Sequence, residues 1–317
     1  MKDEEHRIYT RARLAQLSSL PLRAKVHLTM RRVRQWHDSH DGIYLSYSGG
    51  KDSTVLLHII RQMYDASECP AVFVNTGLEW PGVKRMGIRL ADEVLTPAMK
   101  FKDVLRTYGY AVVSKETSQR IRETRTTTSD KLRSIRLGAG RHAIPGRYRY
   151  LLDAPFKISE QCCTVFKKRP AKAYEHRTGR APVIATMASE SELRRQSWMK
   201  YGCNAFAAAR PISRPMSVWT EQDVLEYIVT HGIEIAPEYG QIEGTPGHYH
   251  LSGMSRTGCM FCLYGLHLNP GEAAERFRYM REYHPHLYEL CINDLGLGEV
   301  MDFMQIDFKF VQTRLFD

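Results

Sequence analysis

The sequence predicts an α/β fold, built on a mostly parallel sheet of about five strands with helices on both faces. Short runs rich in β-branched residues alternate with stretches of helical periodicity, and one such run enters a helix through a glycine-rich turn. Strands that alternate with helices are typical of parallel sheets with crossover helices. Two pairs of cysteines, one of them late in the chain, add the expectation of a small helical, cysteine-bearing C-terminal region.

Three consecutive segments are expected. Residues 1–40 form an N-terminal helical segment, because residues 21–38 have the pattern of an amphipathic helix with Pro21 at its first turn. Residues 41–230 contain the strands and form the α/β domain. Residues 231–317 form the C-terminal region, in which a helical tail is expected around 272–292.

The expected elements of the α/β domain follow from local patterns. Strands are predicted at 43–47, 71–75, 111–114 and 182–186, and helices at 54–63 and 220–231. The helix at 220–231 has both of its end signals, since Thr220 is a good N-cap residue and Gly232 lies just past the last turn.

Composition limits the class of protein. The chain has 317 residues, of which 43% are hydrophobic, and it contains no run of 18 apolar residues that would span a membrane. The N-terminus, MKDEEHRIYTRARLAQ, is charged and has no apolar core, which predicts a cytoplasmic protein rather than a secreted one. In a reducing compartment, the seven cysteines are expected to bind metal or to act in catalysis rather than to form a disulfide framework.

Positive charge is concentrated in one segment. The formal net charge is +10, and residues 115–149 hold ten Lys/Arg but only three Asp/Glu. This segment is interpreted as a mobile basic loop or arm that attracts polyanions such as DNA, tRNA or nucleotide phosphates. A solvated surface loop without a partner is an equally good interpretation.

The glycine-rich turn, SGGKDS, has the chemistry of a phosphate site. In a parallel sheet, a strand-to-helix turn lies at the carboxyl edge, where ligands bind. Gly49 and Gly50 allow the backbone N–H groups to approach an anion, Lys51 adds a positive charge, and Ser48 and Ser53 add hydroxyl donors. The turn is not a Walker A loop, because its two glycines are adjacent and an aspartate follows the lysine.

SGGKDS resembles the pyrophosphate-binding PP-loop of the adenine nucleotide alpha hydrolase superfamily. VFVNTGLEWPGV (72–83), ATMASESELRRQSW (185–198) and RPISRPMSVWTEQDVLEYI (210–228) are similar to segments of the phosphoadenosine phosphosulfate (PAPS) reductase family within it. The resemblance implies a Rossmann-like sheet and an adenine nucleotide, either ATP with Mg²⁺ or a sulfonucleotide. Asn75 stands where the family usually has aspartate, which weakens an acid or metal role at that position.

The resemblance also implies site residues. Nucleotide-binding residues are expected at Ser46, Ser48, Gly49, Gly50, Lys51, Asp52, Ser53, Asn75, Thr76, Gly77, Thr186 and Met187. Substrate-binding residues are expected at Arg194, Arg195, Gln196 and Ser197, and catalysis is expected to depend on Lys51, Asp52, Arg194 and Arg195.

Four cysteines form a candidate metal site. Cys162 and Cys163 are adjacent, and Cys259 and Cys262 form a C-x-x-C pair. Adjacent cysteines suit a 4Fe-4S cluster, in which each thiolate takes its own iron, better than a single tetrahedral zinc ion. The same pattern resembles that of iron–sulfur adenylylsulfate (APS) reductases and DNA phosphorothioation enzymes. Zinc and unligated thiols remain alternatives, and Cys69, Cys203 and Cys291 are expected to be packed residues or, for the last two, working thiols.

Three functions are consistent with these features. The first is an ATP-dependent enzyme that adenylates a nucleic acid or small molecule for sulfur transfer, with a cysteine desulfurase or a thioredoxin-type reductant as an expected partner. The second is a true APS/PAPS reductase with Cys203 or Cys291 as nucleophile, although the chain lacks the Glu-Cys-Gly tail of that group. The third is a nucleic-acid-binding module whose loop senses nucleotide.

Overall fold

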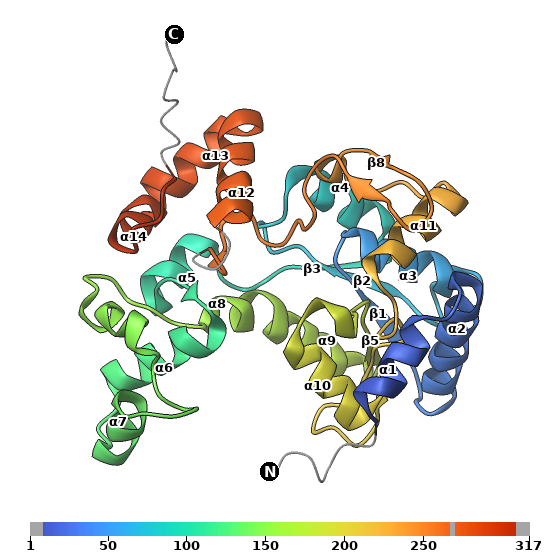
Figure 1. Ribbon diagram of the computed structural model, residues 1–317, viewed down its shortest axis with the longest axis horizontal. Helices are drawn as coiled ribbons and strands as arrows, with labels where there is room; N and C mark the ends of the chain where they lie inside the picture. The colour runs from blue at the N-terminus through green and yellow to red at the C-terminus, as the bar shows by residue number, and fades with distance from the viewer. Residues whose placement is uncertain (1–8, 267–269, 309–317) are drawn as a thin grey trace. The chain divides into compact units, whose positions relative to one another are not determined.

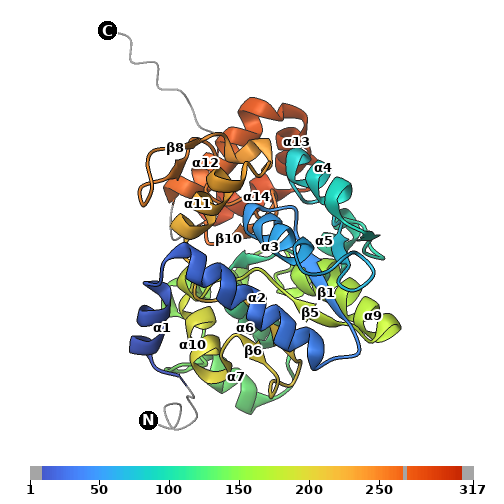
Figure 2. The same ribbon diagram turned by 90° about the vertical axis from the view of Figure 1, so that its right-hand side faces the viewer.

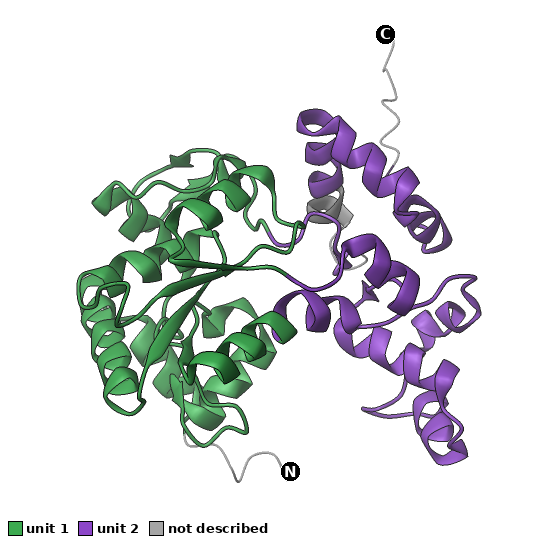
Figure 3. Ribbon diagram, turned by 180° about the vertical axis from the view of Figure 1, so that it is seen from behind, with its two compact units in different colours: residues 1–96, 169–257 green, residues 97–168, 258–317 purple. Residues whose placement is uncertain are grey.

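The structure, a computed structural model, describes residues 9–266 and 270–308. Two compact units are present, and each combines two separate stretches of chain (Figure 3). Unit 1 contains residues 1–96 and 169–257, and unit 2 contains residues 97–168 and 258–317. This division differs from the three consecutive segments expected from the sequence, because residues 97–168 leave the sheet region and pair with the C-terminal part of the chain.

Unit 1 is built on a six-stranded sheet with the order β3-β2-β1-β5-β7-β6. The strands are β1 (Ile43–Tyr47), β2 (Ala71–Val74), β3 (Glu93–Leu95), β5 (Ala181–Val183), β6 (Asn204–Ala205) and β7 (Ile212–Ser213). All neighbouring pairs are parallel except β6 with β7. The predicted α/β fold is therefore confirmed, and the carboxyl ends of β1, β2, β5 and β7 lie at one edge.

Helices precede, connect and follow these strands along the chain (Figure 1). They are α1 (Arg11–Ser18), α2 (Leu22–Asp38), α3 (Lys51–Arg61), α4 (Pro81–Leu90), α9 (Arg169–Thr178), α10 (Glu192–Tyr201) and α11 (Glu221–His231). A short antiparallel pair, β8 (Ile242–Glu243) with β9 (His250–Leu251), follows α11. None of the helices in the described part of the chain is long and apolar enough to cross a membrane.

The central strand β1 is covered on both faces. Ile43, Leu45 and Tyr47 point into the main core, which also contains apolar side chains of α2, α3 and α11. α2 and α3 lie side by side over this face (Figures 1 and 2). Tyr44, which alternates with these residues, packs with Tyr174 of α9 on the opposite face, where its hydroxyl donates to Glu175 at 2.7 Å. Burial on both faces is typical of a parallel sheet.

A buried ion pair joins α2 to α11. The Lys25 ammonium lies 2.6 and 2.8 Å from the two oxygens of Asp223, and both side chains are buried. Asp223 also accepts from the Thr220 backbone N–H at 2.6 Å, and Thr220 caps the helix in return, so the predicted N-cap is part of a capping box. The Trp219 indole N–H donates to Thr29 at 2.9 Å. The WT…D motif of this chain thus holds two helices together.

Unit 2 is mainly helical. It contains α5 (Phe101–Tyr108), α6 (Lys115–Thr126), α7 (Asp130–Leu137), η1 (Gly146–Asp153), α8 (Gln161–Cys163), η2 (Thr164–Lys168), α12 (Pro270–Tyr283), α13 (Pro285–Glu289), η5 (Leu290–Asp294) and α14 (Leu297–Phe303). Its two-stranded sheet pairs β4 (Val112–Val113) with β10 (Leu263–Tyr264). The strand predicted at 111–114 exists, but it pairs with a distant segment and not with the main sheet.

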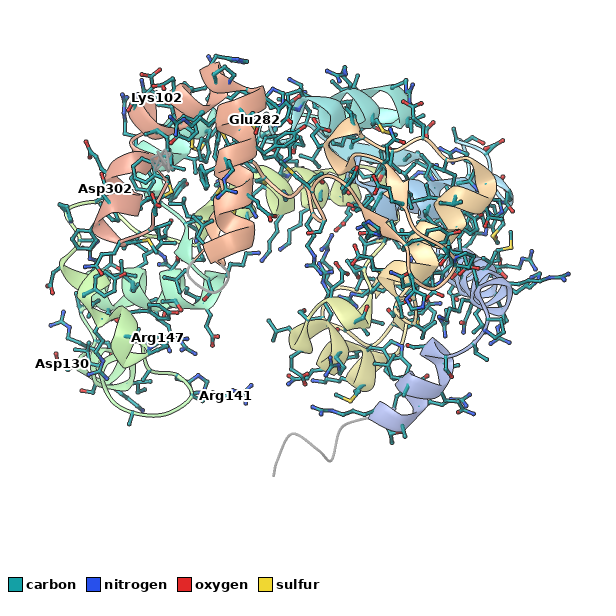
Figure 4. All side chains as sticks on the ribbon, turned by 45° about the horizontal axis from the view of Figure 1, so that its top comes forward. Lys102, Asp130, Arg141, Arg147, Glu282 and Asp302 are labelled. Atoms are coloured by element: carbon teal, nitrogen blue, oxygen red, sulfur yellow. The ribbon has the colours of Figure 1, made fainter. Side chains whose placement is uncertain are left out.

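The basic segment 115–149 is not the mobile loop expected from its composition. It forms α6, α7 and η1, because Ser114 and Ser129 each cap a helix by accepting from a backbone N–H three residues later. Figure 4 labels Asp130, Arg141 and Arg147 at the α7 end of this segment.

Most arginines of this segment serve the fold. Arg120 donates to the Ala143 carbonyl at 2.7 Å, Arg122 pairs with Glu160 at 2.9 Å, and Arg136 pairs with Glu123 at 2.7 Å. Arg125 donates to the carbonyls of three residues between 152 and 156. These four arginines therefore have partners within unit 2 and hold its elements together.

Candidate functional site

The turn between β1 and α3 is tight and packs closely against α4. Gly49 has a φ of +74°, and a Cβ placed on it would lie 2.5 Å from the Val83 carbonyl oxygen of α4. Only glycine fits this position without strain. The Ser48 and Ser53 hydroxyls lie 2.9 Å apart, and the Ser53 hydroxyl donates to the Gly50 carbonyl at 2.9 Å. The N-terminal end of α3 begins at Lys51, so its positive dipole end lies at the turn.

Lys51 is buried, with about 4% of its surface exposed, and it is surrounded by acceptors. Its ammonium lies 3.4 Å from each of Asp52, Glu221 and the Ser255 carbonyl. Burial lowers the pKa of Lys51, but the charges of Asp52, Tyr239 and Glu221 outweigh it, so the pKa is raised and the cation is retained.

Tyr239 and Thr257 cover the start of α3, and no local sequence pattern predicts either residue there. The Lys51 backbone N–H donates to the Tyr239 hydroxyl at 3.2 Å, and that hydroxyl lies 2.9 Å from the Thr257 hydroxyl. The Thr257 carbonyl accepts from the Trp80 indole N–H at 2.7 Å. Both Tyr239 and Thr257 are buried, so the segment that follows α11 forms one wall of the turn.

Asp52 is a half-buried carboxyl with a raised pKa; about 26% of its side chain is exposed. Burial is the largest cause, the Lys51 charge opposes it, and the charges of Glu190 and Glu221 add to it. Its Oδ1 is covered and accepts no hydrogen bond among the described residues, although the Lys51 ammonium lies 3.4 Å from it. A carboxyl with a raised pKa in a site of this kind is a candidate proton carrier.

The other predicted nucleotide residues also lie at strand ends. Asn75, Thr76 and Gly77 follow β2, where the Thr76 hydroxyl donates to Glu79 at 2.6 Å and the Gly77 N–H donates to Asn75 at 3.3 Å. Thr186 and Met187 follow β5, and the Thr186 hydroxyl is buried without a partner in the described part of the chain. Ser46 lies within β1 itself. Because β1, β2 and β5 are parallel, their carboxyl ends lie at the same edge of the sheet as the turn between β1 and α3.

The predicted substrate residues lie on α10. Arg194 pairs with Glu190, Arg195 pairs with Glu192 at 2.9 Å, and Gln196 donates to Glu192 at 3.2 Å; Ser197 follows on the same helix. Arg214, which the sequence analysis missed, follows β7 at the same edge. Burial and then the charges of Arg194 and Arg210 lower its pKa. The positive charges of Arg194 and Arg214 repel one another, so an anion bound beside both would be stabilised by both.

The four cysteines proposed as metal ligands all lie in unit 2. Burial, followed by the charges of Cys163, Cys259 and Cys262, raises the pKa of Cys162. Burial and the charge of Cys259 raise the pKa of Cys262 to about 11. The four thiols are therefore near one another, although residues 163 and 259 are far apart in sequence. Among the described residues, no three or more His, Cys, Asp or Glu side chains are grouped closely enough to hold a metal ion.

The other cysteines are packed. Cys69 and Cys291 are fully buried, burial raises the pKa of Cys69 to about 12, and it raises that of Cys291 as well. Cys203 is buried and accepts from the Trp198 indole N–H at 3.3 Å. All three side chains are buried, so none has the exposure that a thiolate nucleophile needs.

The model of the phosphoadenosine phosphosulfate reductase domain matches residues 42–263, which is more than two thirds of the chain. This chain belongs to the PAPS reductase domain family. The match to that family begins just before β1 and ends in β10, so it includes the turn, the arginines of α10 and all four clustered cysteines. No curated protein matches the chain.

Two solved structures are similar to this member of the PAPS reductase domain family. One is PAPS reductase from Candida auris in complex with phosphate, with 11% identity and a TM-score of 0.40, covering 76% of this chain and 97% of that one. The other is the U34-tRNA thiolase NcsA from Methanococcus maripaludis with its [4Fe-4S] cluster, with 12% identity and a TM-score of 0.36, covering 90% of this chain and 82% of that one.

Proposed function

We propose that this chain is an ATP-dependent PP-loop enzyme that adenylates a substrate oxygen and prepares that position for attack by sulfur. The observation that supports the proposal is the turn at Gly49, which requires glycine and lies at the N-terminal end of α3, beside the buried Lys51. The expected substrate is an oxygen of a tRNA, DNA or small-molecule acceptor. The sulfur donor is expected to be a persulfide or sulfide supplied by a partner protein.

The reaction begins with a bond from the acceptor oxygen to the α-phosphorus of ATP, while the bond to the pyrophosphate oxygen breaks. The turn N–H groups and the Lys51 ammonium stabilise the charge that develops on the departing pyrophosphate. Asp52, whose pKa is raised chiefly by burial, is suited to hold the proton that leaves the acceptor oxygen. Sulfide then attacks the activated position and AMP departs; with a persulfide donor, the attack forms a disulfide between product and donor, which a thiol reductant must cleave to release the thiolated product. Mg²⁺ stays a prediction, as no carboxylate group placed to bind it was found in the described residues.

The alternative function, a sulfonucleotide reductase with a cysteine nucleophile, is less well supported than the adenylating enzyme. A sulfonucleotide reductase needs a thiolate that attacks sulfur. Cys203 and Cys291, the two candidates, are buried, and burial raises the pKa of Cys291. This observation favours the adenylating enzyme over the reductase.

The four thiols of unit 2 fit a cluster better than a single ion. The preference for a cluster comes from the sequence pattern: Cys162 and Cys163 are adjacent, and a 4Fe-4S cluster spreads its four thiolates over four irons, whereas a zinc ion needs all four on one metal. The electrostatic influence of the four thiols on one another is consistent with their sharing one part of unit 2. Cys162, Cys163, Cys259 and Cys262 would hold it, and it would supply either a rigid link or a sulfur-binding iron centre.

The nucleic-acid-binding alternative depends on the basic segment 115–149. Most of its arginines already have partners within unit 2, as shown for Arg120, Arg122 and Arg136. We therefore propose that nucleic acid, if it binds, is the acceptor substrate of the reaction rather than the ligand of a non-catalytic binding module.

The test is nucleotide turnover by anaerobically prepared protein. ATP labelled at the α-phosphate is incubated with the protein and either bulk tRNA, DNA or no acceptor, and AMP and pyrophosphate are measured. We expect acceptor-dependent AMP formation, and a loss of about 10²–10³-fold in the Lys51→Met variant. Lys102→Met, a change of an exposed lysine in α5, is the matched control and should leave turnover unchanged.

Two results would decide against the proposal. Thiol-dependent sulfite release from APS or PAPS, without AMP formation from ATP, would establish the reductase instead. Salt-sensitive nucleic-acid binding without any AMP or pyrophosphate release would establish the binding module.

A further inference from the structure

Hydroxyl groups of the protein hold three backbone N–H groups of the turn between β1 and α3. The Ser48 N–H donates to the Ser53 hydroxyl at 3.2 Å, and the Gly50 N–H donates to the Ser48 hydroxyl at 3.4 Å. The Lys51 N–H donates to the Tyr239 hydroxyl at 3.2 Å. A phosphate oxygen bound to any of these N–H groups would therefore take the place of a hydroxyl oxygen.

The three hydroxyls differ in how easily they can leave the turn. The Ser48 and Ser53 hydroxyls move away by rotation about one side-chain bond. The Tyr239 oxygen lies on the axis of its ring, so rotation of the ring does not move it, and the whole side chain has to shift. Because Tyr239 is only 3% exposed, such a shift also moves the residues packed around it.

Tyr239 is held against the turn by the segment that follows α11. Its hydroxyl lies 2.9 Å from the Thr257 hydroxyl, and a Cβ placed on Gly50 would lie 3.1 Å from it. The carboxylate of the preceding residue, Glu238, accepts from the Gly82 N–H in the first turn of α4 at 2.6 Å. The phenol is thus positioned by contacts on both sides, and it closes off the Lys51 N–H.

An anion is a stronger acceptor for this N–H than a phenol. Hydrogen bonds to a charged acceptor are roughly twice as strong as those between neutral groups. The Lys51 ammonium, which keeps its charge, attracts a phosphate further. A phosphate oxygen can therefore displace the Tyr239 hydroxyl, but part of its binding free energy is used to move the phenol.

We propose that Tyr239 is a positioning residue of the nucleotide site, whose hydroxyl holds the Lys51 N–H in the nucleotide-free protein and is displaced from it by a phosphate oxygen of the bound nucleotide. The inference rests on phosphate binding at this turn, as in the proposed function, and adds a residue that regulates the affinity. The phenol keeps a buried N–H hydrogen-bonded while the site is empty, and it weakens phosphate binding because it competes for the same donor.

The test compares Tyr239→Phe with wild type in two measurements, calorimetric titration with inorganic pyrophosphate and urea unfolding with and without pyrophosphate. The free variant should be less stable than wild type, because the Lys51 N–H loses its acceptor. It should bind pyrophosphate about threefold to tenfold more tightly, because no hydroxyl has to be displaced. By linkage, the difference in stability should shrink at saturating pyrophosphate, whereas a purely structural role of Tyr239 would leave it unchanged.

Tyr227→Phe is the matched control. The Tyr227 hydroxyl, also in unit 1, lies 3.0 Å from His58 Nδ1 and accepts from the Gln62 amide at 3.1 Å. Its loss should lower stability by the same amount with and without pyrophosphate and should leave the affinity for pyrophosphate unchanged.

Thr257→Val is a second variant, which keeps Tyr239 and removes the hydroxyl beside it. Without this neighbour the phenol is held less firmly, so pyrophosphate should bind more tightly than to wild type, by a smaller factor than in Tyr239→Phe. This variant decides the question if Tyr239→Phe does not fold, and wild-type affinity in Thr257→Val would then overturn the inference.

The outcomes separate this inference from the proposed function. Unchanged or weaker pyrophosphate binding by Tyr239→Phe overturns the inference alone, because the hydroxyl then stays on the Lys51 N–H or contacts the phosphate itself. A wild-type protein that binds neither pyrophosphate nor ATP overturns both. A wild-type protein that binds both ligands but forms no AMP with any acceptor overturns the proposed function and leaves the inference standing.

Discussion

At the scale of single residues, Lys51 and Asp52 show how burial prepares a site. Lys51 keeps its charge because Asp52 and Glu221 lie 3.4 Å from it, whereas Asp52 is pushed toward its neutral form by burial. The same surroundings raise both pKa values, which favours the charged form of Lys51 and the neutral form of Asp52. This is the arrangement expected where one group stabilises negative charge and the next handles a proton.

The first prediction concerns Gly49. Gly49→Ala combines an unfavourable φ of +74° with a contact of 2.5 Å to the Val83 carbonyl, and we expect unit 1 to lose about 1–3 kcal/mol of stability. Urea unfolding measures it. Gly146→Ala is the control, since a Cβ there meets no atom within 4 Å and should change stability little. Equal effects of both variants would remove the argument that the turn requires glycine.

The second prediction concerns Asp52. Because its folded-state pKa lies above the unfolded value, the native state binds more protons between these two values, and the free energy of unfolding falls as pH rises through that window. Asp52→Asn should therefore be more stable than wild type near neutral pH and similar to it in acid. Urea unfolding from pH 4 to pH 8 checks this, with the exposed Asp41→Asn as control. A variant that is less stable than wild type at neutral pH would show that Asp52 is stabilised as a charged group.

At the scale of helices and strands, the buried pair Lys25–Asp223 connects two helices that are far apart in sequence. Lys25 and Asp223 have side-chain exposures of 3% and 10%, and Asp223 also closes the capping box of α11. The motif of Trp219, Thr220 and Asp223, which resembles the PAPS reductase family, therefore has a structural role: it joins α2 to α11.

The third prediction follows from this pair. Asp223→Ala leaves the Lys25 ammonium buried without its counter-charge, and we expect a loss of about 3–5 kcal/mol in urea unfolding. Adding Lys25→Met should restore part of that loss. Glu234→Ala, which removes the exposed partner of Arg89, is the control and should cost less than about 1 kcal/mol. A double variant no more stable than Asp223→Ala would mean that capping, and not the buried charge, is the larger effect.

At the scale of the whole molecule, the chain is divided between two units that each carry one candidate site. The nucleotide turn lies in unit 1 and the clustered cysteines lie in unit 2 (Figure 3). Each unit contains its own buried residues, for example Trp36 and Phe73 in unit 1 and Phe166 and Phe277 in unit 2. Ligands of the two sites should therefore stabilise different parts of the protein.

The fourth prediction is that calorimetry of the anaerobic protein resolves two transitions. ATP should raise the temperature of one, and anaerobic removal of iron should lower the temperature of the other. A variant assigns each transition to a unit. Because Asp223 lies in unit 1, Asp223→Ala should change the temperature of the transition that ATP raises. A single transition that responds equally to both ligands would contradict independent units.

Features that depend on neighbouring residues could be predicted from the amino-acid sequence. The turn at Ser48–Ser53, strand β1 and the capped helix α11 all follow from glycine, alternation and N-cap signals within a few positions, since these interactions are local. The predicted helix at 21–38 is present as α2 (Leu22–Asp38) for the same reason.

Which distant segments meet depends on packing in three dimensions. The Lys51 amide meets the Tyr239 hydroxyl across 188 positions, and the Trp80 indole meets the Thr257 carbonyl across 177. Arg120, Arg122 and Arg136 of the basic segment have partners within their own unit. Composition could not predict these contacts, because whether a polar group is paired or free depends on three-dimensional packing and not on the residues beside it in the chain.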